Sequence, residues 1–190
     1  MTPETITELL TELFDTAVEA SPPDRWQIVD GDSRLLILLS EDQSWLRVLM
    51  SIAPAQDAQS LLAQLLEANF DETQEARYAL YQNVLWGVFQ HAMDTLTAAS
   101  LKQAIARLIH MRQNGLSEAF QKVAESQIRQ IIYASKMQGQ SIETTMRTLE
   151  RFYQEGVMGE LSQDEEQRER VLGAWRYQLE RLWDEVGDEG

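Results

Sequence analysis

The stretch LLAQLLEANFDETQEARYALYQNVLWGVFQHAMDTL, residues 61–96, joins a helix-like pattern to two strand-like runs. Leucines at helical spacing fill its first part, and this helix is predicted to stop near Asn69, a residue that tolerates the left-handed conformation at helix ends. Residues 76–81 and 84–89 are short runs rich in apolar and aromatic residues, separated by a Gln-Asn pair. Two such runs across a two-residue turn predict a β-hairpin.

The second run of this hairpin has no polar face. It contains Val84, Leu85, Trp86, Val88 and Phe89. A strand that is apolar on both sides must be covered on both sides. One cover is the domain's own helices, and the other is either further chain or a second subunit. We therefore expect a homodimer unless the C-terminal part of the chain covers this strand.

The residues before this stretch predict a helix, three strands and the start of a second helix. An apolar stripe at helical spacing runs through the N-terminal segment and ends before two prolines, which do not continue a helix. The stripe and the prolines are Ile6, Leu9, Leu10, Leu13, Phe14, Ala17, Pro22 and Pro23. Residues 26–29, 35–39 and 45–52 follow as strands of an antiparallel meander. The run 35–39 is apolar throughout, as expected of a strand covered on both faces.

The chain from Thr97 onward is predicted to be helical. One helix ends near Gly115, a second covers residues 116–137, and a third covers residues 141–154. A capping box at residues 162–165 opens the last helix. Its apolar stripe contains Val171, Leu172, Trp175, Leu179, Leu182, Trp183 and Val186.

The predicted fold class is α+β, with C-terminal α-helices after an antiparallel sheet. We place the α+β domain at residues 1–114 and a helical extension, packed on it, at residues 115–190. The helices of the extension either form a bundle of their own or fold back over the sheet. We favour folding back, because the break at Gly115 is too short for a flexible linker.

The composition disfavours several classes of function. The 190 residues are 44% hydrophobic and 25% charged, as in an ordinary soluble globular protein. The formal net charge is −15 and neither half of the chain is basic, which disfavours nucleic-acid binding and contact with an anionic membrane. A partner with a basic segment would complement this charge. We find no signal sequence and no run of 18 apolar residues, and we expect a cytoplasmic protein.

The residue patterns of common catalytic and cofactor sites are missing from the sequence. It has no cysteine, and its two histidines, His91 and His110, are not brought together by any motif. The nine glycines are scattered, so neither a phosphate-binding loop nor a dinucleotide-binding loop is present. Pairs of acidic residues are common, as a chain with 31 acids places them on solvated faces. We therefore expect no metal, no cofactor and no enzymatic activity.

The order of the predicted elements over residues 1–114 resembles the type III secretion chaperone family, with its Tir chaperone-like fold. A helix, three strands, a helix, two strands and a helix follow one another. The family pattern Leu-Leu-x-x-Leu-Leu-x-Ala-Asn, followed by a hairpin, stands here at residues 61–69. The resemblance implies an α+β domain that usually dimerises, presents apolar patches to an extended client segment, and uses neither ATP nor a cofactor. Family members normally end near residue 114, whereas this chain continues with helices.

These patterns predict a non-catalytic protein-binding module, chaperone-like or adaptor-like, that holds a partner polypeptide through apolar surface. A homodimeric assembly factor without an extended client is the alternative, and an enzyme with an unrecognised site is the third possibility. The candidate binding residues are Trp86, Val88, Phe89, Trp175, Leu179 and Trp183. Large apolar side chains are favoured anchors of interfaces, although the same residues fill cores more often.

Overall fold

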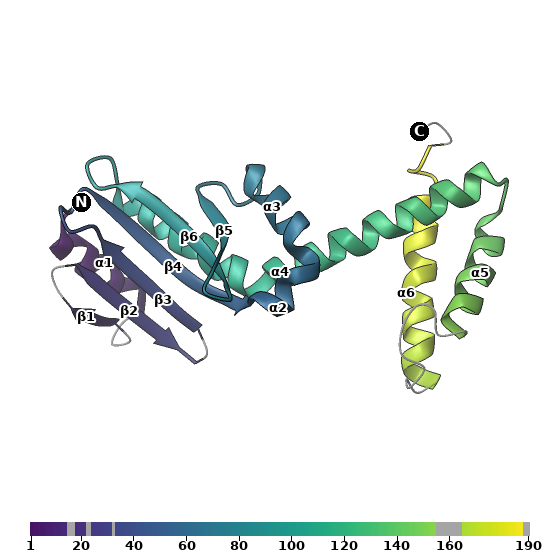
Figure 1. Ribbon diagram of the computed structural model, residues 1–190, viewed down its shortest axis with the longest axis horizontal. Helices are drawn as coiled ribbons and strands as arrows, with labels where there is room; N and C mark the ends of the chain where they lie inside the picture. Colours follow the sequence, from purple (N-terminus) through teal and green to yellow (C-terminus); the bar gives the residue numbers. More distant parts are fainter. Residues whose placement is uncertain (15–17, 22–23, 32, 155–164, 188–190) are drawn as a thin grey trace. The chain divides into compact units, whose positions relative to one another are not determined.

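The computed structural model describes residues 1–14, 18–21, 24–31, 33–154 and 165–187. It contains two compact units, Met1–Phe120 and Gln121–Gly190 (Figure 1). The predicted α+β class is confirmed, with an antiparallel sheet followed by C-terminal helices. The predicted boundary after residue 114, and the packing of residues 115–190 on the first domain, stay predictions.

The first unit is built on a six-stranded antiparallel sheet with the strand order β1-β2-β3-β4-β6-β5. The strands are β1 (Val18–Ser21), β2 (Arg25–Asp30), β3 (Ser33–Leu39), β4 (Trp45–Pro54), β5 (Ala76–Tyr81) and β6 (Val84–Ala92). The helical elements of this unit are α1 (Pro3–Phe14), α2 (Ala55–Ala58), η2 (Gln59–Leu61), α3 (Leu62–Asp71) and the first half of α4 (Ala98–Met137). The connection through α2 and α3 places β6 beside β4, and β5 becomes the edge strand.

The hairpin between β5 and β6 forms as predicted. Gln82 and Asn83 both have positive φ angles, 48° and 60°. A two-residue turn with both residues in the left-handed region matches the twist of the strands that it joins. The hairpin pairs Tyr81 with Val84 and Ala76 with Phe89.

Burial alternates along the strands, because successive side chains point to opposite faces of a sheet. One face is buried under α1 and α4, which lie behind the sheet in Figure 1. Its buried residues include Trp26, Ile37, Leu46, Val48, Leu85 and Phe89. The side chains of the other face, which we call the open face, are partly buried or exposed. The prediction that residues 35–39 are covered on both faces is therefore wrong for this unit, since Leu36 and Leu38 lie on the open face.

Close packing of α4 on the sheet depends on two glycines. A Cβ atom on Gly87 of β6 would lie 2.9 Å from Cδ2 of Leu108. A Cβ atom on Gly115 would fall on the hydroxyl oxygen of Tyr78 in β5. The predicted helix break at Gly115 is wrong, because α4 continues through it to Met137. This glycine allows close approach of a helix and a strand, which a local pattern cannot distinguish from a helix end.

The N-terminal segment is shorter as a helix than predicted. α1 ends at Phe14, and Val18–Ser21 forms the edge strand β1, paired with β2. Residues 15–17, 22 and 23, including the two prolines, lie outside the described residues. Strand pairing with β2 decides the conformation of β1, and this long-range contact leaves no signal in the local helical spacing.

Asn69 acts differently from the helix stop that we predicted. The helix continues to Asp71, and the positive φ angle falls on Gln74. The amide of Asn69 instead bonds the backbone of Tyr78 twice: its Nδ2 donates to the carbonyl oxygen at 3.2 Å, and its Oδ1 accepts from the backbone N–H at 2.7 Å. The side chain thus pairs with the edge strand β5 as another strand would.

The second unit is a small helical bundle with its own core. It contains the last part of α4, α5 (Ile142–Gln154) and α6 (Glu165–Trp183). The core residues are Ile128, Ile132, Met146, Leu149, Leu179 and Leu182. The predicted break at Gly139 is present, with a φ angle of 67°. The predicted breaks at Gly156 and Gly159, and most of the capping box at 162–165, lie outside the described residues.

Candidate protein-binding surfaces

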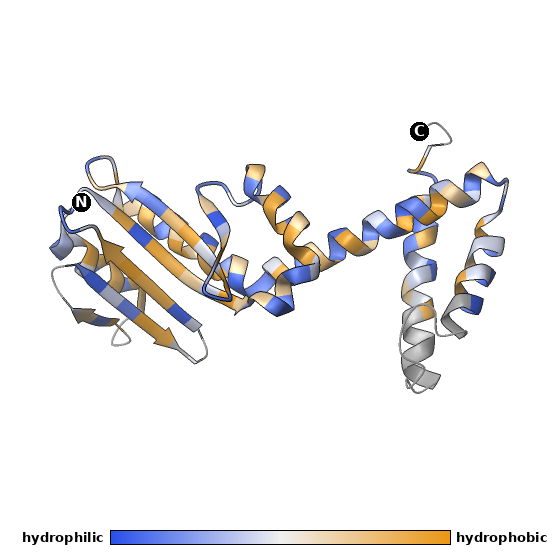
Figure 2. Cartoon of the chain, in the orientation of Figure 1, coloured by the Kyte–Doolittle hydropathy of each residue, from blue (hydrophilic) through white to orange (hydrophobic). Residues whose placement is uncertain are grey.

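The open face of the sheet has an apolar centre. Leu36, Leu49 and Val88 are register partners across β3, β4 and β6, so their side chains lie in one row. Trp86 stands two residues from Val88 on the same face and pairs with Ala79 of β5. Figure 2 shows this apolar character as orange segments along β3, β4 and β6. These side chains are only partly buried, so a partner could remove further apolar surface from water.

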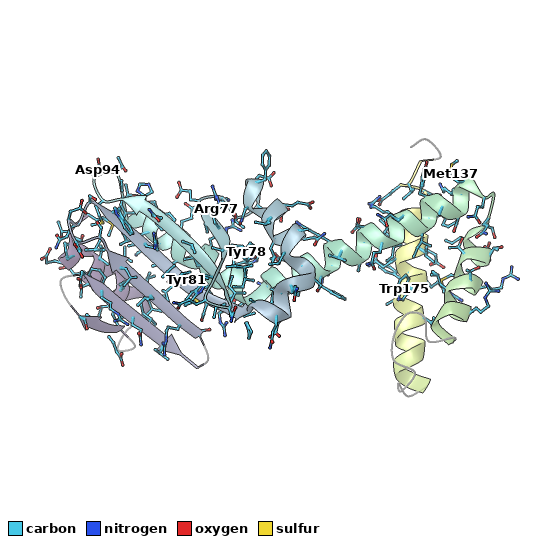
Figure 3. All side chains as sticks on the ribbon, in the orientation of Figure 1. Arg77, Tyr78, Tyr81, Asp94, Met137 and Trp175 are labelled. Atoms are coloured by element: carbon cyan, nitrogen blue, oxygen red, sulfur yellow. The ribbon has the colours of Figure 1, made fainter. Side chains whose placement is uncertain are left out.

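Arginines surround this apolar centre. β2, β3, β4 and β5 each carry one, namely Arg25, Arg34, Arg47 and Arg77. The register places Arg25 opposite Leu38, and Arg77 opposite Val88. Figure 3 labels Arg77 on β5. All four therefore lie on the open face.

Arg47 is held in place on this face. Its Nε and Nη2 atoms donate to Oε1 of Gln90 at 3.2 and 3.0 Å. Its guanidinium lies 4.9 Å from the centre of the Trp45 ring, a cation–π distance. A side chain that is already oriented loses less conformational entropy when a partner binds.

A second apolar patch lies on α3 and β5. We call it the α3 patch, and it consists of Leu62, Leu66, Phe70 and Leu80. Phe70 is 92% exposed and Leu66 is 66% exposed. Leu62 and Leu80 also line one shallow pocket together with residues of α2. Exposed apolar side chains at successive turns of one helix are typical of an interaction surface.

The structure separates the three candidate residues of β6. Trp86 and Val88 lie on the open face, and their role in binding stays a prediction. Phe89 is 0% exposed and belongs to the face under the helices. β6 does carry apolar residues on both faces, as predicted. Among the described residues of the first unit, however, helices cover only one of these faces. Successive side chains of a strand point to opposite faces, so Phe89 lies in the core while its neighbour Val88 lies on the open face.

The three candidate residues of α6 belong to the bundle core rather than to an exposed stripe. Leu179 is 0% exposed. Trp175 and Trp183 are partly buried and pack against the same core. Nζ of Lys136 lies 5.7 Å from the centre of the Trp183 ring and donates to the carbonyl oxygen of Val186 at 2.7 Å. The prediction that a partner binds the three α6 residues stays a prediction. Only the outer parts of the two indole rings are exposed for such a contact.

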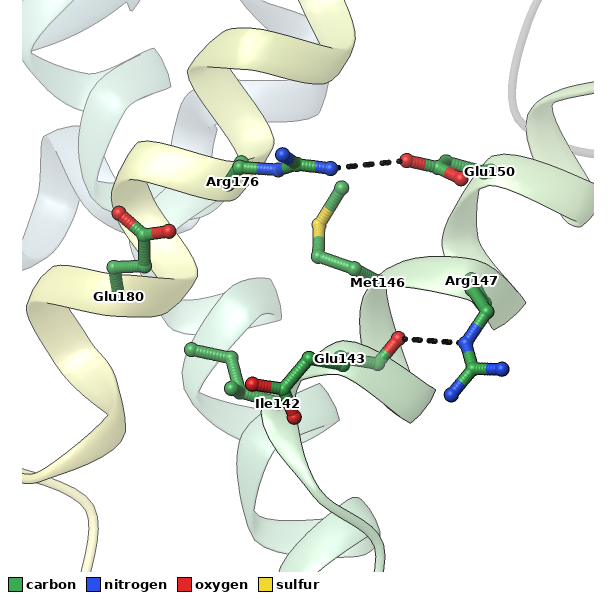
Figure 4. Close-up of a pocket in the computed structure, with 7 residues that line it drawn as sticks. All are labelled: Ile142, Glu143, Met146, Arg147, Glu150, Arg176 and Glu180. Atoms are coloured by element: carbon green, nitrogen blue, oxygen red, sulfur yellow. Dashed lines mark hydrogen bonds and ion pairs between the residues drawn. The ribbon is translucent and has the colours of Figure 1, made fainter.

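A shallow pocket of about 240 Å³ lies between α5 and α6 (Figure 4). Met146 forms its apolar part, and charged side chains surround it: Glu143, Arg147, Glu150, Arg176 and Glu180. Arg176 pairs with Glu150 at 3.5 Å. Mixed charges that pair with one another hold helices together, and no nucleophile stands beside a base here.

Ion pairs link α4 to α6 in the bundle. Arg129 bonds Glu125 at 2.9 Å and Glu185 at 2.6 Å, and Arg181 bonds Glu125 at 3.1 Å. The hydrogen bonds from Arg129 and then Arg181 lower the pKa of Glu125. This network is exposed and fits a structural role.

Two further pKa shifts arise from local structure. Hydrogen bonds from Ser40 and then Ser44 lower the pKa of Asp42 to about 2 in the loop between β3 and β4. Burial raises the pKa of Tyr78 to about 12, with the charge of Glu118 as a smaller cause. Oδ1 of Asp42 accepts hydrogen bonds from the hydroxyls of Ser40 and Ser44 and from the backbone N–H of Ser44, and the Tyr78 hydroxyl is buried against α4. Neither is placed as an acid–base catalyst.

Comparisons with known proteins find relatives by structure alone. No family model matches the sequence, and no curated protein matches it. The structure is similar to chains from several solved complexes, at identities below 20%. The fold is similar to that of type III secretion chaperones. These structures are of the same family that the sequence resembles.

Three of these structures give the extent of the similarity. The HopA1–SchA chaperone–effector complex matches at a TM-score of 0.45 and 16% identity, over 56% of this chain and 86% of that one. The ExoU–SpcU complex of the Pseudomonas aeruginosa type III secretion system matches at 0.46 and 14%, over 59% and 95%. The Yersinia pestis chaperone SycH, with a fragment of YscM2, matches at 0.46 and 17%, over 59% and 97%. This similarity concerns the fold and says nothing of what this chain binds.

Two absences hold for the part of the chain that the structure describes. Within it, no three His, Asp or Glu side chains are grouped so that they could hold a metal ion. No helix within the same residues is long and apolar enough to cross a membrane. The predicted lack of enzymatic activity and of a cofactor stays a prediction.

Most of the open face was not predicted from the sequence. Leu36 and Leu38 were assigned to the covered interior, and Leu49, Arg25, Arg34 and Arg77 were not singled out. One signal was present in the spacing of these arginines. Each arginine either stands an even number of residues from an apolar open-face residue of its own strand, or lies opposite such a residue of the next strand. Using it requires the register between strands, which the sequence alone does not fix.

Proposed function

We propose that this chain is a non-catalytic protein-binding module, chaperone-like or adaptor-like, that holds a partner polypeptide on the open face. The observation that carries the proposal is the apolar row Leu36, Leu49 and Val88, whose side chains remain only partly buried among the described residues of the first unit. A cytoplasmic location is part of the same proposal. The three strands that carry this row, β3, β4 and β6, are all internal to the sheet, so the surface is rigid before binding.

Selection of peptides from a random 12-residue library on the immobilised full chain tests this proposal. The retained peptides are then measured against a triple variant, Leu36→Thr, Leu49→Thr and Val88→Thr. Threonine is β-branched, which suits a strand, and it has less apolar surface than leucine or valine. Each substitution should cost about 1 kcal/mol of binding, so we expect the triple variant to bind at least tenfold more weakly.

Leu66→Thr on the α3 patch is the matched control, since it changes an equally apolar residue outside the open face. Peptides that bind the triple variant and the original chain equally would place binding elsewhere. A selection that retains no peptide at all would contradict a protein-binding role for this surface.

A homodimeric assembly factor is the second candidate function, and the α3 patch favours it. A second copy of the chain would bury Phe70 and Leu66 by repeating the same patch across a two-fold axis. Sedimentation at micromolar concentration should then show a dimer. The variant Leu66→Glu with Phe70→Glu should convert it to a monomer, whereas Val88→Thr should leave it unchanged. A monomer at every concentration would exclude this function.

A further inference from the structure

We propose that the open face selects an acidic and apolar segment of a separate partner polypeptide, against the sign of the chain's own net charge. This inference rests on the proposed function and adds the chemistry of the partner. The occupant has large apolar side chains for the row Leu36, Leu49 and Val88. It also has carboxylates that meet the surrounding arginines.

The distribution of charge carries the first step. The chain has 31 acidic and 16 basic residues. Even so, β3, β4, β5 and β6 contain neither Asp nor Glu, while three of these strands each carry an arginine. Among the described strand side chains of the open face, the one acidic residue is Glu19, on the edge strand β1. An excess of positive charge on this face, in a chain that is otherwise acidic, would draw an acidic segment to it.

The arrangement of the arginines carries the second step. Arg77 is the register partner of Val88, and Arg47 is the register partner of both Leu38 and Gln90. Arg34 stands two residues from Leu36 along β3, and Arg77 lies beside Val88 on β5. With strands about 4.8 Å apart and a rise of about 3.3 Å per residue, the Cα atoms of these two arginines are separated by roughly 16 Å. An extended segment spans this distance with four or five residues. Alternating acidic and apolar residues would meet both kinds of surface.

Self-coverage of the sheet is the other explanation for these arginines. In that explanation their aliphatic stems shield apolar neighbours from water, and the guanidinium of Arg47 lies over the ring of Trp45. That role needs no carboxylate. Among the described residues, none of the four arginines forms an ion pair with Asp or Glu. Arg47 and Arg77 bond only neutral oxygen atoms, of Gln90 and of backbone carbonyls. Their charges therefore remain available to a partner.

The test uses the peptides selected on the full chain from the random 12-residue library. Peptides that lose binding to the triple threonine variant define the open-face binders. We expect these binders to carry net negative charge, and to bind the variant Arg34→Glu with Arg47→Glu about tenfold more weakly, since each lost pair is worth up to about 1 kcal/mol. Arg34→Lys with Arg47→Lys should retain most of the affinity, and raising the salt concentration should weaken binding.

Arg147→Glu on α5 is the matched control, because it reverses the charge of an exposed arginine that belongs to the second unit. Open-face binders that are neutral or basic, or that bind the Arg34→Glu, Arg47→Glu variant as well as the original chain, would overturn the inference and leave the proposed function standing. A selection without open-face binders would overturn both.

Discussion

Replacing Gly115 by alanine tests how closely α4 lies on the sheet. Two effects of opposite sign compete. Alanine is favoured over glycine inside a helix by about 1 kcal/mol, so an unobstructed site would be stabilised. Here the new Cβ atom would fall on the hydroxyl oxygen of Tyr78 and lie 3.1 Å from its Cζ atom. Overpacking of a full core typically costs 1–3 kcal/mol.

We expect the clash to outweigh the gain in helix propensity. Tyr78 is 8% exposed, and its backbone is held by two hydrogen bonds with the side chain of Asn69. Its ring therefore has little freedom to move away. The net loss in the free energy of unfolding should be about 1–2 kcal/mol. Tyr78→Phe removes the colliding oxygen, so Gly115→Ala should cost less, or even stabilise, in that background. The coupling between the two substitutions should be about 1–2 kcal/mol.

Native-state hydrogen exchange of the amides of β4 and β6 measures this effect, because it reports on the first unit alone. Gly173→Ala in α6 is the control. A Cβ atom there meets nothing within 4 Å, so this variant should stabilise the second unit by about 0.5–1 kcal/mol. Stabilisation of the first unit by Gly115→Ala in the original background would refute the close packing of α4 on β5.

Three other predictions concern the sheet. Asn69→Ala should destabilise the first unit by about 1–2 kcal/mol, because both hydrogen bonds to the edge strand are lost. Hydrogen exchange at the backbone amide of Tyr78 should become faster, and an unchanged exchange rate would argue against the pairing. Arg112→Met should lower the free energy of unfolding, measured with denaturant, by about 2–3 kcal/mol, because Arg112 donates to Ser33 and to the carbonyl oxygens beside the β4 irregularity. A decrease below about 0.5 kcal/mol would contradict this role. The carboxyl of Asp42 should titrate near pH 2 by NMR, so its contribution to stability is present above about pH 4 and is lost as the pH falls to about 2; a midpoint near 3.8 would show that the loop bonds do not persist in solution.

The elements that the sequence predicted well are those decided by neighbouring residues. The hairpin of β5 and β6 depends on two residues that accept left-handed angles, and the end of α4 depends on Gly139. The order of helices and strands over residues 1–114 was also read correctly, apart from β1. That order was enough to indicate the fold, because short connections leave few ways to arrange one antiparallel sheet with its helices.

The tertiary structure decided everything that depends on distant parts of the chain. Gly115 has the local pattern of a helix end, and only Tyr78, 37 positions away, shows that it is a packing residue. Phe89 and Val88 are equally apolar in sequence, and the placement of α4 behind the sheet buries the first and leaves the second on the open face. The arginines gather on that face only through the register of the strands that carry them. Hydrophobicity is a property of each side chain, whereas burial and local charge depend on its neighbours in space, and so the open face could not be predicted from the sequence.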